Sequence, residues 1–504
     1  MADVREYKLF IGGEWAAAAS GETFESTNPS DGSGVGRIAR GGREDMARGI
    51  SAARAAFDSG VWSDMPQAER TGRMLRAWEA LSAALPELAQ IEAEDAGHTL
   101  RMANLFSIAL GVEHWKMIAE QAATLGEYEP VPWNDYPAPS WGFVRREPFG
   151  VTAAITPWNF PFILMMWKVG PALATGNTVV IKPATYTPMS TLHFAKVLQE
   201  ADVFPPGVIN VVPGAGAAAG EELVGNPMVD KVAFTGSTEV GRRIMQLASS
   251  TVKKVTLELG GKSANIILDD ADLDIAVPGS LWATFLHQGQ ICHSGTRLFV
   301  PASLHDEMIA RMVETAEGLK IGSALDFESD MGPLIHRSQF ETVDRYVQSG
   351  LQQGAKLATG GERAHVAGHD GGYYYRPTIF TDVTNDMAIA QEEIFGPVLS
   401  VIRYESVEDA IAMANDSIYG LGGGVWSRDI PRAINVAKRI RTGTVWINDY
   451  HLLNGYAPFG GYKQSGIGRE LGSWGIREYQ QTKYIHVDQV PSKDQKFWFQ
   501  ILGL

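Results

Sequence analysis

The sequence predicts an α/β protein built around parallel sheets. From residue 151 onward, short apolar runs alternate with segments of helical periodicity, which is typical of βαβ units. The length of 504 residues favours two or three domains, at roughly 100–200 residues per domain. Apolar residues make up 45% of the chain and charged residues 20%, as in ordinary globular proteins.

Each element is predicted from its local pattern. Residues 43–125 are rich in Ala, Leu, Glu and Arg at helical spacing, so we expect helices there. The stretch 126–150 holds many Pro and aromatic residues and is expected to form an extended arm. The expected strands are VTAAIT (151–156), NTVVIKP (177–183), VINVVPG (208–214), KVAFTG (231–236), VKKVTLELGG (252–261), ANIILDD (264–270), GTVWIND (443–449) and KYIHVDQV (483–490). The expected helices include FILMMWKVGPALATG (162–176), TLHFAKVLQEA (191–201), 280–292 and 303–318.

Charge and cysteine content argue against several classes of protein. Lys and Arg number 43 against 58 Asp and Glu, and the net charge of −15 disfavours a general nucleic-acid binder. A single Cys permits no internal disulfide, which suits a reducing compartment. The first residues lack the apolar core of a signal peptide, and the run FPFILMMW (160–167) is shorter than the ~20 residues that span a bilayer. We therefore expect a cytoplasmic protein without nucleic-acid or membrane partners.

Three familiar motifs are absent or incomplete. GAGAAAG (214–220) has the spacing G-x-G-x-x-x-G without a convincing acidic partner downstream, so a plain Gly-rich loop is the better interpretation. GGKS (260–263) lacks the Gly that a P-loop needs, because Thr256 occupies that position. No HExxH or paired CxxC occurs, so no metal site is expected.

The only cysteine, Cys292, lies in HQGQICHSGTRLF (287–299). A free Cys is most often a small buried apolar residue. These polar, glycine-bearing flanks instead suit an accessible nucleophile with backbone donors nearby.

His287 and His293 suggest a Cys–His hydrolase, but immediate neighbours on a helix or strand do not face each other, so we expect both to pack or to line a pocket. Glu258 ends the alternating strand KKVTLELGG and is the better base, although a solvated Glu explains this stretch equally well.

Six blocks resemble the aldehyde dehydrogenase superfamily. TLELGGKSANII with GQICHSGTRLFV is one, and the others are ITPWNFPF (155–162), IKPATYTP (181–188), FTGSTEVG (234–241), EEIFGPV (392–398) and GYAPFGGYKQSGIGRELG (455–472). They follow the family order across nearly the whole chain. The resemblance implies a Rossmann-like cofactor-binding domain (1–125 and 149–260), an α/β catalytic domain (261–470) and a small β bridging and oligomerisation arm with the tail (126–148 and 471–504). It also implies a homodimer or homotetramer.

The resemblance implies that an aldehyde is oxidised to the carboxylic acid with NAD(P)⁺ through a thiohemiacetal and a thioester on Cys292. Asn159 would hold the oxyanion together with the Cys292 backbone N–H, Glu258 would be the general base, and Glu470 would join a proton relay. CoA-acylating relatives usually lack the Glu matched by Glu258. A thiol esterase would not need the nucleotide blocks, and a non-catalytic homologue would be expected to lose the nucleophile or the base.

The resemblance also assigns cofactor contacts. They are Ile155, Thr156, Pro157, Trp158, Lys182, Thr185, Gly236, Ser237, Leu259, Glu393 and Phe395. The segment FTGSTEVG places Gly236 and Ser237 at a strand-to-helix junction, where free N–H groups suit a pyrophosphate. Many NAD-preferring relatives have Glu at the position of Thr185, and that Glu repels a 2′-phosphate. Because Thr185 is uncharged and Lys182 lies nearby in the sequence, we expect NAD or NADP to be the cofactor. NADP is expected to be accepted, and whether it is preferred over NAD stays open.

The substrate tunnel is expected at positions that are mostly apolar or aromatic. They are Phe160, Leu164, Trp167, Phe285, Ile291, His293, Leu453 and Phe459. Relatives that oxidise semialdehyde acids carry Arg at the position of Trp167, so we expect uncharged aliphatic or aromatic aldehydes. Betaine-aldehyde or semialdehyde oxidation stays as the alternative, and CoA acylation is weaker. The tail VPSKDQKFWFQILGL could cover a neighbouring subunit or fold back.

Overall fold

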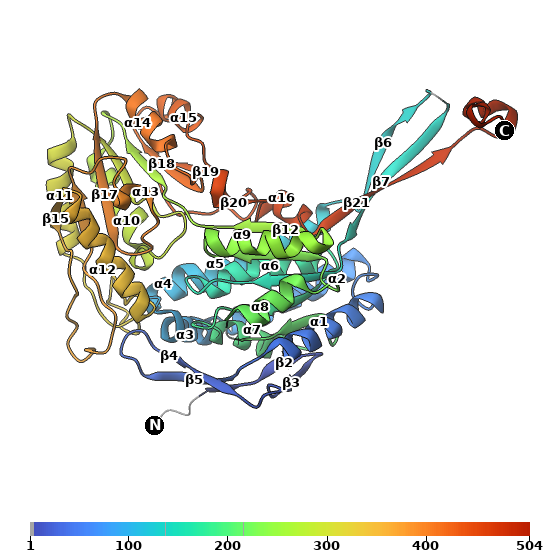
Figure 1. Ribbon diagram of the computed structural model, residues 1–504, viewed down its shortest axis with the longest axis horizontal. Coiled ribbons are helices and arrows are strands. Elements are labelled where there is room, and N and C mark those ends of the chain that lie inside the picture. The colour runs from blue at the N-terminus through green and yellow to red at the C-terminus, as the bar shows by residue number, and fades with distance from the viewer. Residues whose placement is uncertain (1–4, 137, 215) are drawn as a thin grey trace.

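A computed structural model describes residues 5–136, 138–214 and 216–504 and has two α/β layers and a projecting arm (Figure 1). The first sheet has eight strands in the order β20-β12-β11-β8-β9-β10-β2-β3. Its five central strands are parallel, and β20, β2 and β3 are antiparallel to their neighbours. The bounds are β2 (Leu9–Ile11), β3 (Glu14–Ala16), β8 (Val151–Ile155), β9 (Thr178–Lys182), β10 (Ile209–Val211), β11 (Lys231–Thr235), β12 (Lys254–Glu258) and β20 (Gly466–Ile467).

Helices cover both faces of this sheet, so its central strands are mostly buried and rich in apolar residues. In β9, Val179 and Ile181 join one core while Val180 joins the core on the opposite face, as strand alternation requires. One face carries α1 (Arg43–Asp58), α8 (Gly216–Gly225) and α9 (Thr238–Ala248). The other carries α2 (Gln67–Ala83), α3 (Leu85–Ala96), α5 (Ile108–Thr124), α6 (Pro161–Ala174) and α7 (Met189–Glu200). The helices and strands predicted for this part are confirmed.

The second sheet has seven strands in the order β15-β16-β17-β14-β13-β18-β19, all parallel to their neighbours except β15. Its strands are β13 (Ala264–Ile267), β14 (Arg297–Pro301), β15 (Lys356–Thr359), β16 (Thr378–Thr381), β17 (Val398–Tyr404), β18 (Gly422–Trp426) and β19 (Thr444–Ile447). Its helices are α10 (Leu273–Phe285), α11 (His305–Glu317), α12 (Arg337–Gln352), α13 (Ala388–Gln391), α14 (Val407–Asn415) and α15 (Ile430–Ala437).

The helix expected at 280–292 is wrong in its bounds. The observed α10 spans Leu273–Phe285, and a 3-10 turn, η3 (Leu286–Gly289), follows it. Within that turn His287 and Gln288 have φ of 47° and 54°, a left-handed backbone that cannot continue an α-helix. Cys292 therefore lies on a turn and not on a helix.

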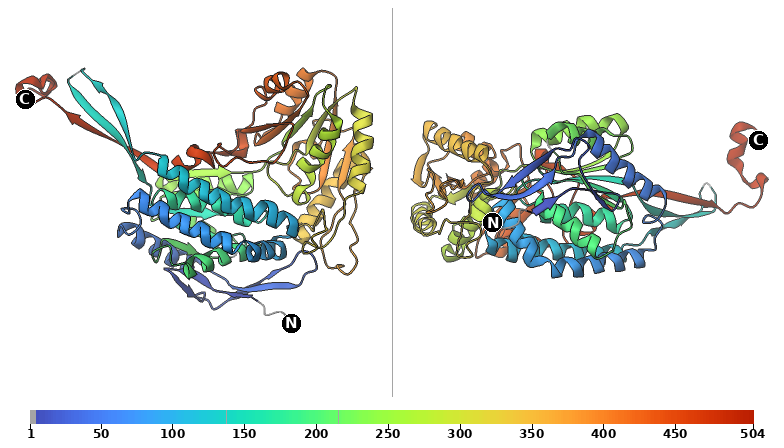
Figure 2. Two further views of the ribbon diagram at one scale, coloured as in Figure 1. Left: turned by 180° about the vertical axis from the view of Figure 1, so that it is seen from behind. Right: turned by 90° about the horizontal axis from the view of Figure 1, so that it is seen from below.

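A three-stranded antiparallel sheet projects from the body as an arm (Figures 1 and 2). It has the order β21-β7-β6, with β6 (Tyr128–Asn134), β7 (Ser140–Pro148) and β21 (Gln480–Asp488), so the extended arm and late strand predicted from the sequence are confirmed. The tail turns η5 (Lys493–Gln495) and η6 (Phe497–Leu502) lie beyond the arm, away from the body (Figure 1). The tail therefore does not fold back onto its own subunit.

The remaining elements are short. A small sheet in the order β1-β5-β4 crosses the bottom of the molecule in Figure 1. The bounds are β1 (Arg5–Tyr7), β4 (Thr23–Thr27), β5 (Gly34–Ala39), α4 (Leu100–Met102), η1 (Ala103–Ser107), η2 (Ser249–Thr251), η4 (Lys463–Ser465) and α16 (Gly472–Arg477). Across the described residues, no helix has the length and apolar character that a bilayer crossing needs.

Candidate active site

The predicted catalytic and cofactor segments meet at one edge of the eight-stranded sheet. Parallel pairing sets Ile155 beside Lys182 and Thr235 beside Glu258, so the carboxyl ends of β8, β9, β11 and β12 lie together. From β8 the chain adds β9 and β10 on one side and then β11 and β12 on the other, so the strand order reverses here. Open α/β sheets bind ligands in the crevice at such a reversal.

The turn that carries Cys292 lies directly against this edge. A Cβ on Gly261, just beyond β12, would collide with the carbonyl oxygen of Cys292. Glycine at that position therefore lets the two backbones touch. Cys292 is partly buried and lines a mostly apolar cavity.

The expectation that His293 is badly placed toward the sulfur is wrong. Its Nδ1 lies 3.7 Å from Cys292 Sγ. The helix-neighbour argument fails because α10 has already ended at Phe285. His287 instead packs against His98 and Phe160, with ring centroids 4.2 Å and 5.3 Å away, so it fills the core as expected.

The electrostatic surroundings keep the thiol neutral. Burial raises the pKa of Cys292 well above its usual value, and the nearby Glu258 and Glu393 carboxylates raise it further. A neutral thiol is a weak nucleophile, so a nucleophilic role for Cys292 requires a base that can take its proton.

Glu258 closes β12 and is almost fully buried. Burial raises the pKa of Glu258 well above its usual value, the Glu470 charge raises it further, and Lys168 opposes both. Lys168 donates hydrogen bonds to Glu470 and, at 2.6 Å, to Thr235 Oγ1. The sequence reasoning named Glu470 but missed Lys168, which hides in the apolar helix α6.

Asn159 lies on the loop between β8 and α6 and lines the same cavity as Cys292. Its Nδ2 donates to the Gln290 carbonyl at 2.8 Å, and an amide nitrogen has a second hydrogen to offer. His98 Nε2 lies 2.6 Å from the Asn159 carbonyl and holds this loop in place.

Most of the predicted substrate residues surround one narrow cavity of about 30 Å³. Those confirmed as lining it are Phe160, Leu164, Trp167, Ile291, His293, Leu453 and Phe459. Phe285 is not among them, because it packs into the core of the second sheet with Leu281 and Leu298. The sequence reasoning missed Phe106, Ile163 and His451, which complete the wall.

The expected cofactor residues include a helix start with unpaired donors. Ser237 caps α9 by accepting from the Val240 N–H at 3.3 Å, and the first turn of any helix leaves further N–H groups free. Leu259 packs beneath Gly241 of the same helix. Thr156 Oγ1 is buried without a partner among the described residues, and Lys182 Nζ contacts only the Pro183 carbonyl, at 3.5 Å. These donors fit a nucleotide phosphate and ribose.

The other expected cofactor residues lie on both sides of the crevice. Glu393 accepts from the Gly261 N–H at 3.0 Å, and burial raises the pKa of Glu393 to about 7. Phe395 meets Trp158 edge to face, with ring centroids 5.1 Å apart. Pro157 precedes Trp158 on the same loop, and Thr185 donates to the Gly214 carbonyl at 3.2 Å.

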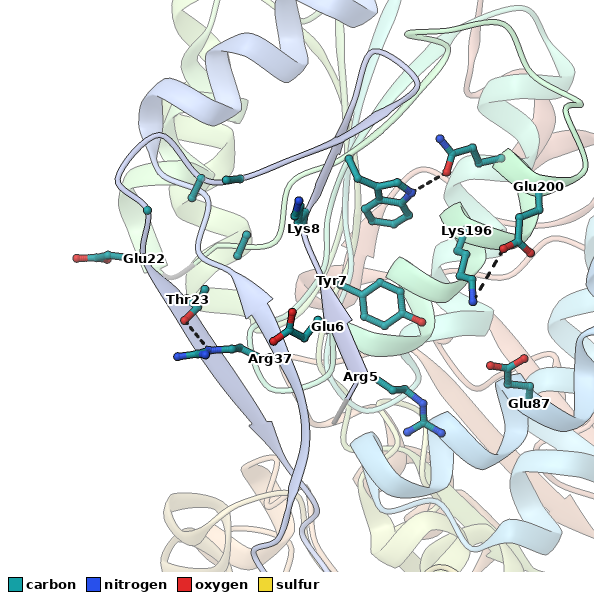
Figure 3. A pocket seen from close by; sticks show the side chains of 16 residues that line it. Arg5, Glu6, Tyr7, Lys8, Glu22, Thr23, Arg37, Glu87, Lys196 and Glu200 are labelled. Atoms are coloured by element: carbon teal, nitrogen blue, oxygen red, sulfur yellow. Dashed lines mark hydrogen bonds and ion pairs between the residues drawn. The ribbon is translucent and has the colours of Figure 1, made fainter. Parts of the chain in front are cut away.

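A roomier cavity, of about 860 Å³, lies at the N-terminal strands and not at this site (Figure 3). Its charged lining is balanced: Arg5, Lys8, Arg37 and Lys196 face Glu6, Glu22, Glu87 and Glu200. None of the predicted site residues lines it. Size alone therefore does not locate the chemistry. Among the described residues, no group of three or more His, Cys, Asp or Glu side chains could hold a metal ion.

Comparisons with known proteins agree with this geometry. The model of the "Aldehyde dehydrogenase family" matches residues 15–485. Betaine aldehyde dehydrogenase of Bacillus subtilis is 44% identical over 486 residues, which cover 96% of this chain and 98% of that protein. Human mitochondrial aldehyde dehydrogenase is 42% identical, with coverage of 97% and 93%. The NAD⁺ complex of an aldehyde dehydrogenase from Bacillus cereus superposes with a TM-score of 0.93 at 43% identity, covering 96% of this chain and 97% of that one. The chain therefore belongs to the aldehyde dehydrogenase family and oxidises aldehydes with NAD(P) as cofactor.

Proposed function

We propose that Cys292, Asn159 and Glu258 carry out the chemistry of this aldehyde dehydrogenase. The observation that supports this most is that Cys292 and Asn159 line one apolar cavity. Glu258 lies three residues before Gly261, which touches the Cys292 backbone. The sulfur attacks the aldehyde carbon, and the Asn159 amide with the Cys292 N–H stabilises the oxyanion, where one such donor contributes ~10²–10³ in rate. The bound nicotinamide supplies a hydride acceptor.

Glu258 then activates the water that hydrolyses the thioester. The hydrogen-bonded pair of Lys168 and Glu470 lies close enough to act on the Glu258 charge and offers a path by which the proton leaves. Acid quenching during turnover, followed by mass spectrometry, tests the covalent step. We expect an acyl adduct on the peptide that carries Cys292, and an unmodified peptide would contradict the proposal.

NADP⁺ is accepted as well as NAD⁺. Thr185 carries no charge, and Lys182 offers a cation without a carboxylate partner among the described residues. A 2′-phosphate therefore meets attraction and no repulsion. Steady-state kinetics with both cofactors tests this, and a hundredfold preference for NAD⁺ refutes it. The variant Thr185→Glu should lose NADP⁺ turnover while keeping NAD⁺ turnover.

The preferred substrates are uncharged aliphatic or aromatic aldehydes. The cavity wall holds Phe160, Leu164, Trp167 and Phe459 and no basic side chain apart from neutral histidines. A carboxylate buried there would have no ion-pair partner. A panel of hexanal, benzaldehyde, betaine aldehyde and succinate semialdehyde, compared by kcat/KM, tests this, and strong preference for the semialdehyde overturns it.

Betaine aldehyde is the second candidate. The aromatic rings of Phe160, Trp167 and Phe459 could receive a quaternary ammonium group through cation–π contacts. The Bacillus subtilis relative also bears that activity in its name. The same panel separates the two, because a cationic substrate should then exceed hexanal.

The sheet topology supports a division of the chain into three parts. We assign residues 1–125 and 149–260 to the cofactor-binding domain, 261–470 to the catalytic domain, and the arm with the tail (126–148 and 471–504) to the oligomerisation unit, with β20 of the catalytic segment completing the first sheet. The arm ends in strand edges with free backbone groups, β6 and β21. Such edges pair readily with another chain, which supports a homodimer or homotetramer.

A further inference from the structure

Two histidines and a backbone carbonyl form a hydrogen-bonded chain that ends at the Cys292 sulfur. Cys292 Sγ lies 3.7 Å from His293 Nδ1. His293 Nε2 lies 3.0 Å from His451 Nδ1, and His451 Nε2 lies 3.1 Å from the Ala283 carbonyl oxygen. The chain thus joins the turn after η3, the segment after β19 and the end of α10.

The direction of every hydrogen bond in this chain follows from its far end. The Ala283 carbonyl can only accept, so His451 Nε2 carries the hydrogen. A neutral His451 then has a lone pair at Nδ1, so His293 Nε2 must be the donor to it. A neutral His293 consequently has its lone pair at Nδ1, the atom that faces the sulfur. One backbone carbonyl therefore sets both tautomers.

Packing fixes the His293 ring in this orientation. It stacks on Trp446 at 5.4 Å with an interplanar angle of 27°, and Phe459 meets its face edge-on at 5.3 Å. The Tyr450 hydroxyl donates to the His293 carbonyl at 2.9 Å. Both histidine side chains are buried, so the ring has little freedom to turn the Nδ1 atom away.

The pKa shifts of the groups along this hydrogen-bonded chain agree with a neutral His293 and a neutral His451. Burial lowers the pKa of His293 well below its usual value and lowers the pKa of His451 to about 3. Burial together with Glu258 and Glu393 raises the pKa of Cys292. Tyr450 also packs against these histidines, and burial raises the pKa of Tyr450 well above its usual value, so its hydroxyl stays neutral. Thiol and imidazole therefore rest uncharged and share one proton.

Glu258 is less suited to this first proton. It makes no hydrogen bond to the sulfur, and Glu258 Oε1 has no partner among the described residues. The thiol has an acceptor in contact, and that acceptor is His293.

We propose that His293 accepts the Cys292 thiol proton as Sγ attacks the aldehyde, and that His451 is a positioning residue that aims the acceptor nitrogen. This inference rests on the proposed role of Cys292 as the nucleophile. Two different residues then accept protons: His293 accepts the proton of the thiol, and Glu258 accepts the proton of the hydrolytic water.

The proton and electron balance closes over one turnover. As the S–C bond forms, the S–H proton moves to His293 Nδ1 and the C=O π electrons move to oxygen. Hydride transfer to the nicotinamide restores the C=O bond and leaves a thioester. Water then gives a proton to Glu258 and its oxygen to the acyl carbon. The S–C bond breaks, the thiolate takes back the proton from His293, and Glu258 releases its proton to solvent.

Alkylation of the cofactor-free enzyme with iodoacetamide tests the proposal without turnover. The chain has one cysteine, so the second-order rate reports Cys292 alone. His293→Phe keeps a ring against Trp446 but removes the acceptor. General-base assistance typically contributes 10²–10⁴-fold, and we expect at least a ~10-fold slower reaction at pH 7. The difference in rate between His293→Phe and the parent should shrink as pH rises, because hydroxide then ionises the thiol.

Three further variants sharpen the result. His293→Asn retains a hydrogen-bond acceptor that cannot take a proton, so it should be as slow as His293→Phe, and it carries the test if the Phe variant does not fold. His451→Leu removes the hydrogen bond that fixes the tautomer of His293. Its alkylation rate should fall less than that of His293→Phe and show the same dependence on pH. His114→Gln is the matched control, because His114 is a buried histidine of α5 that contacts Trp167 and not the sulfur. It should react within about twofold of the parent.

Two outcomes overturn the proposal. One is an alkylation rate of His293→Phe within twofold of the parent rate across pH 6–9. The other is recovery of the parent rate by His293→Asn, because His293 would then only orient the thiol and would not take its proton. Either result is independent of Cys292 as nucleophile. Aldehyde turnover by Cys292→Ser would instead remove the proposed function itself.

Discussion

At the scale of single residues, the proposed reaction depends on one sulfur atom, that of Cys292. Replacing Cys292 with Ser changes one atom, but a hydroxyl at this site would be far less acidic and less nucleophilic than a thiol. We expect aldehyde-dependent NAD(P)H formation to fall at least ~10³-fold. Absorbance at the reduced-cofactor wavelength measures this. Fold integrity is checked by equal thermal unfolding of the two proteins, and undiminished turnover would contradict the assignment.

Glu258 allows the two half-reactions to be separated. In Glu258→Gln the thiol can still attack, since its proton goes to His293, but the hydrolytic water loses its base. We expect a burst of about one NAD(P)H per active site, followed by a steady rate lower by ~10²–10⁴-fold. Stopped-flow absorbance resolves the two phases. Loss of the burst as well would mean that Glu258 serves the thiol.

The same residue sets a pH dependence. Because burial and Glu470 raise the pKa of Glu258, its basic form appears only as pH rises well above the usual carboxylate range. The steady-state rate of the parent should therefore climb with pH through that pKa. Glu258→Gln should lack this rise, because a Gln side chain does not titrate.

Residues with a motif could be predicted from sequence, and residues without one could not. Cys292, Asn159 and Glu258 lie in recognisable blocks, whereas Lys168 looks like one cation in an apolar helix and His451 has no motif at all. His293 was visible but was misjudged, because its contact depends on where α10 ends. A left-handed backbone at His287 and Gln288 has no reliable sequence signal, since neither is Gly or Asn.

At the scale of elements, helix α3 contains two buried carboxyl groups that should make stability depend on pH. Burial raises the pKa of Glu92 to about 8 and that of Asp95 to about 7. The folded state thus holds protons that the unfolded chain releases above the ordinary pKa values of Glu and Asp, 4.5 and 3.8. The free energy of unfolding should fall as pH rises from those values through 7 to 8.

Glu92→Gln tests this contribution. A neutral Gln of similar shape escapes the cost of ionising a buried group, so the variant should lose less stability than the parent between pH 6 and pH 9. At pH 9 we expect it to exceed the parent by about 1 kcal/mol or more, since one pKa unit equals ~1.36 kcal/mol. Thermal unfolding at both pH values measures the difference. Parallel pH curves for the two proteins would show that Glu92 is not the source.

Elements whose pattern repeats were predictable, and elements whose ends depend on contacts were not. The continuous apolar run of β9 identifies a strand that is covered on both faces, and in β12 Val255 and Leu257 alternate with polar residues. The start of α10 at Leu273 was missed because Pro278 lies inside the helix and Gly279 follows it, both weak helix formers. The position of Gly279 is explained only in three dimensions, where a Cβ would collide with the Trp426 ring.

At the scale of the whole molecule, the two α/β units contribute different halves of one site. Glu258 and Asn159 come from the first sheet and its loops, and Cys292 and His451 come from the segments around the second. The contact between Gly261 and the Cys292 backbone joins them. The narrow cavity therefore exists only when both units are folded and in contact.

The arm provides the last prediction, which concerns assembly. β21 is an edge strand of the arm, and the C-terminal tail lies beyond it (Figure 2). The tail includes the exposed side chains of Ile501 and Leu502. A chain that ends at Lys483 loses most of β21, whereas a chain that ends at Val490 loses only the tail. If the strand edge joins subunits, the first should sediment as a smaller species and the second as the full assembly, because backbone pairing needs the strand and not the apolar tail. Light scattering after size exclusion measures both masses, and an unchanged mass for the chain ending at Lys483 would rule out β21 as the joining edge.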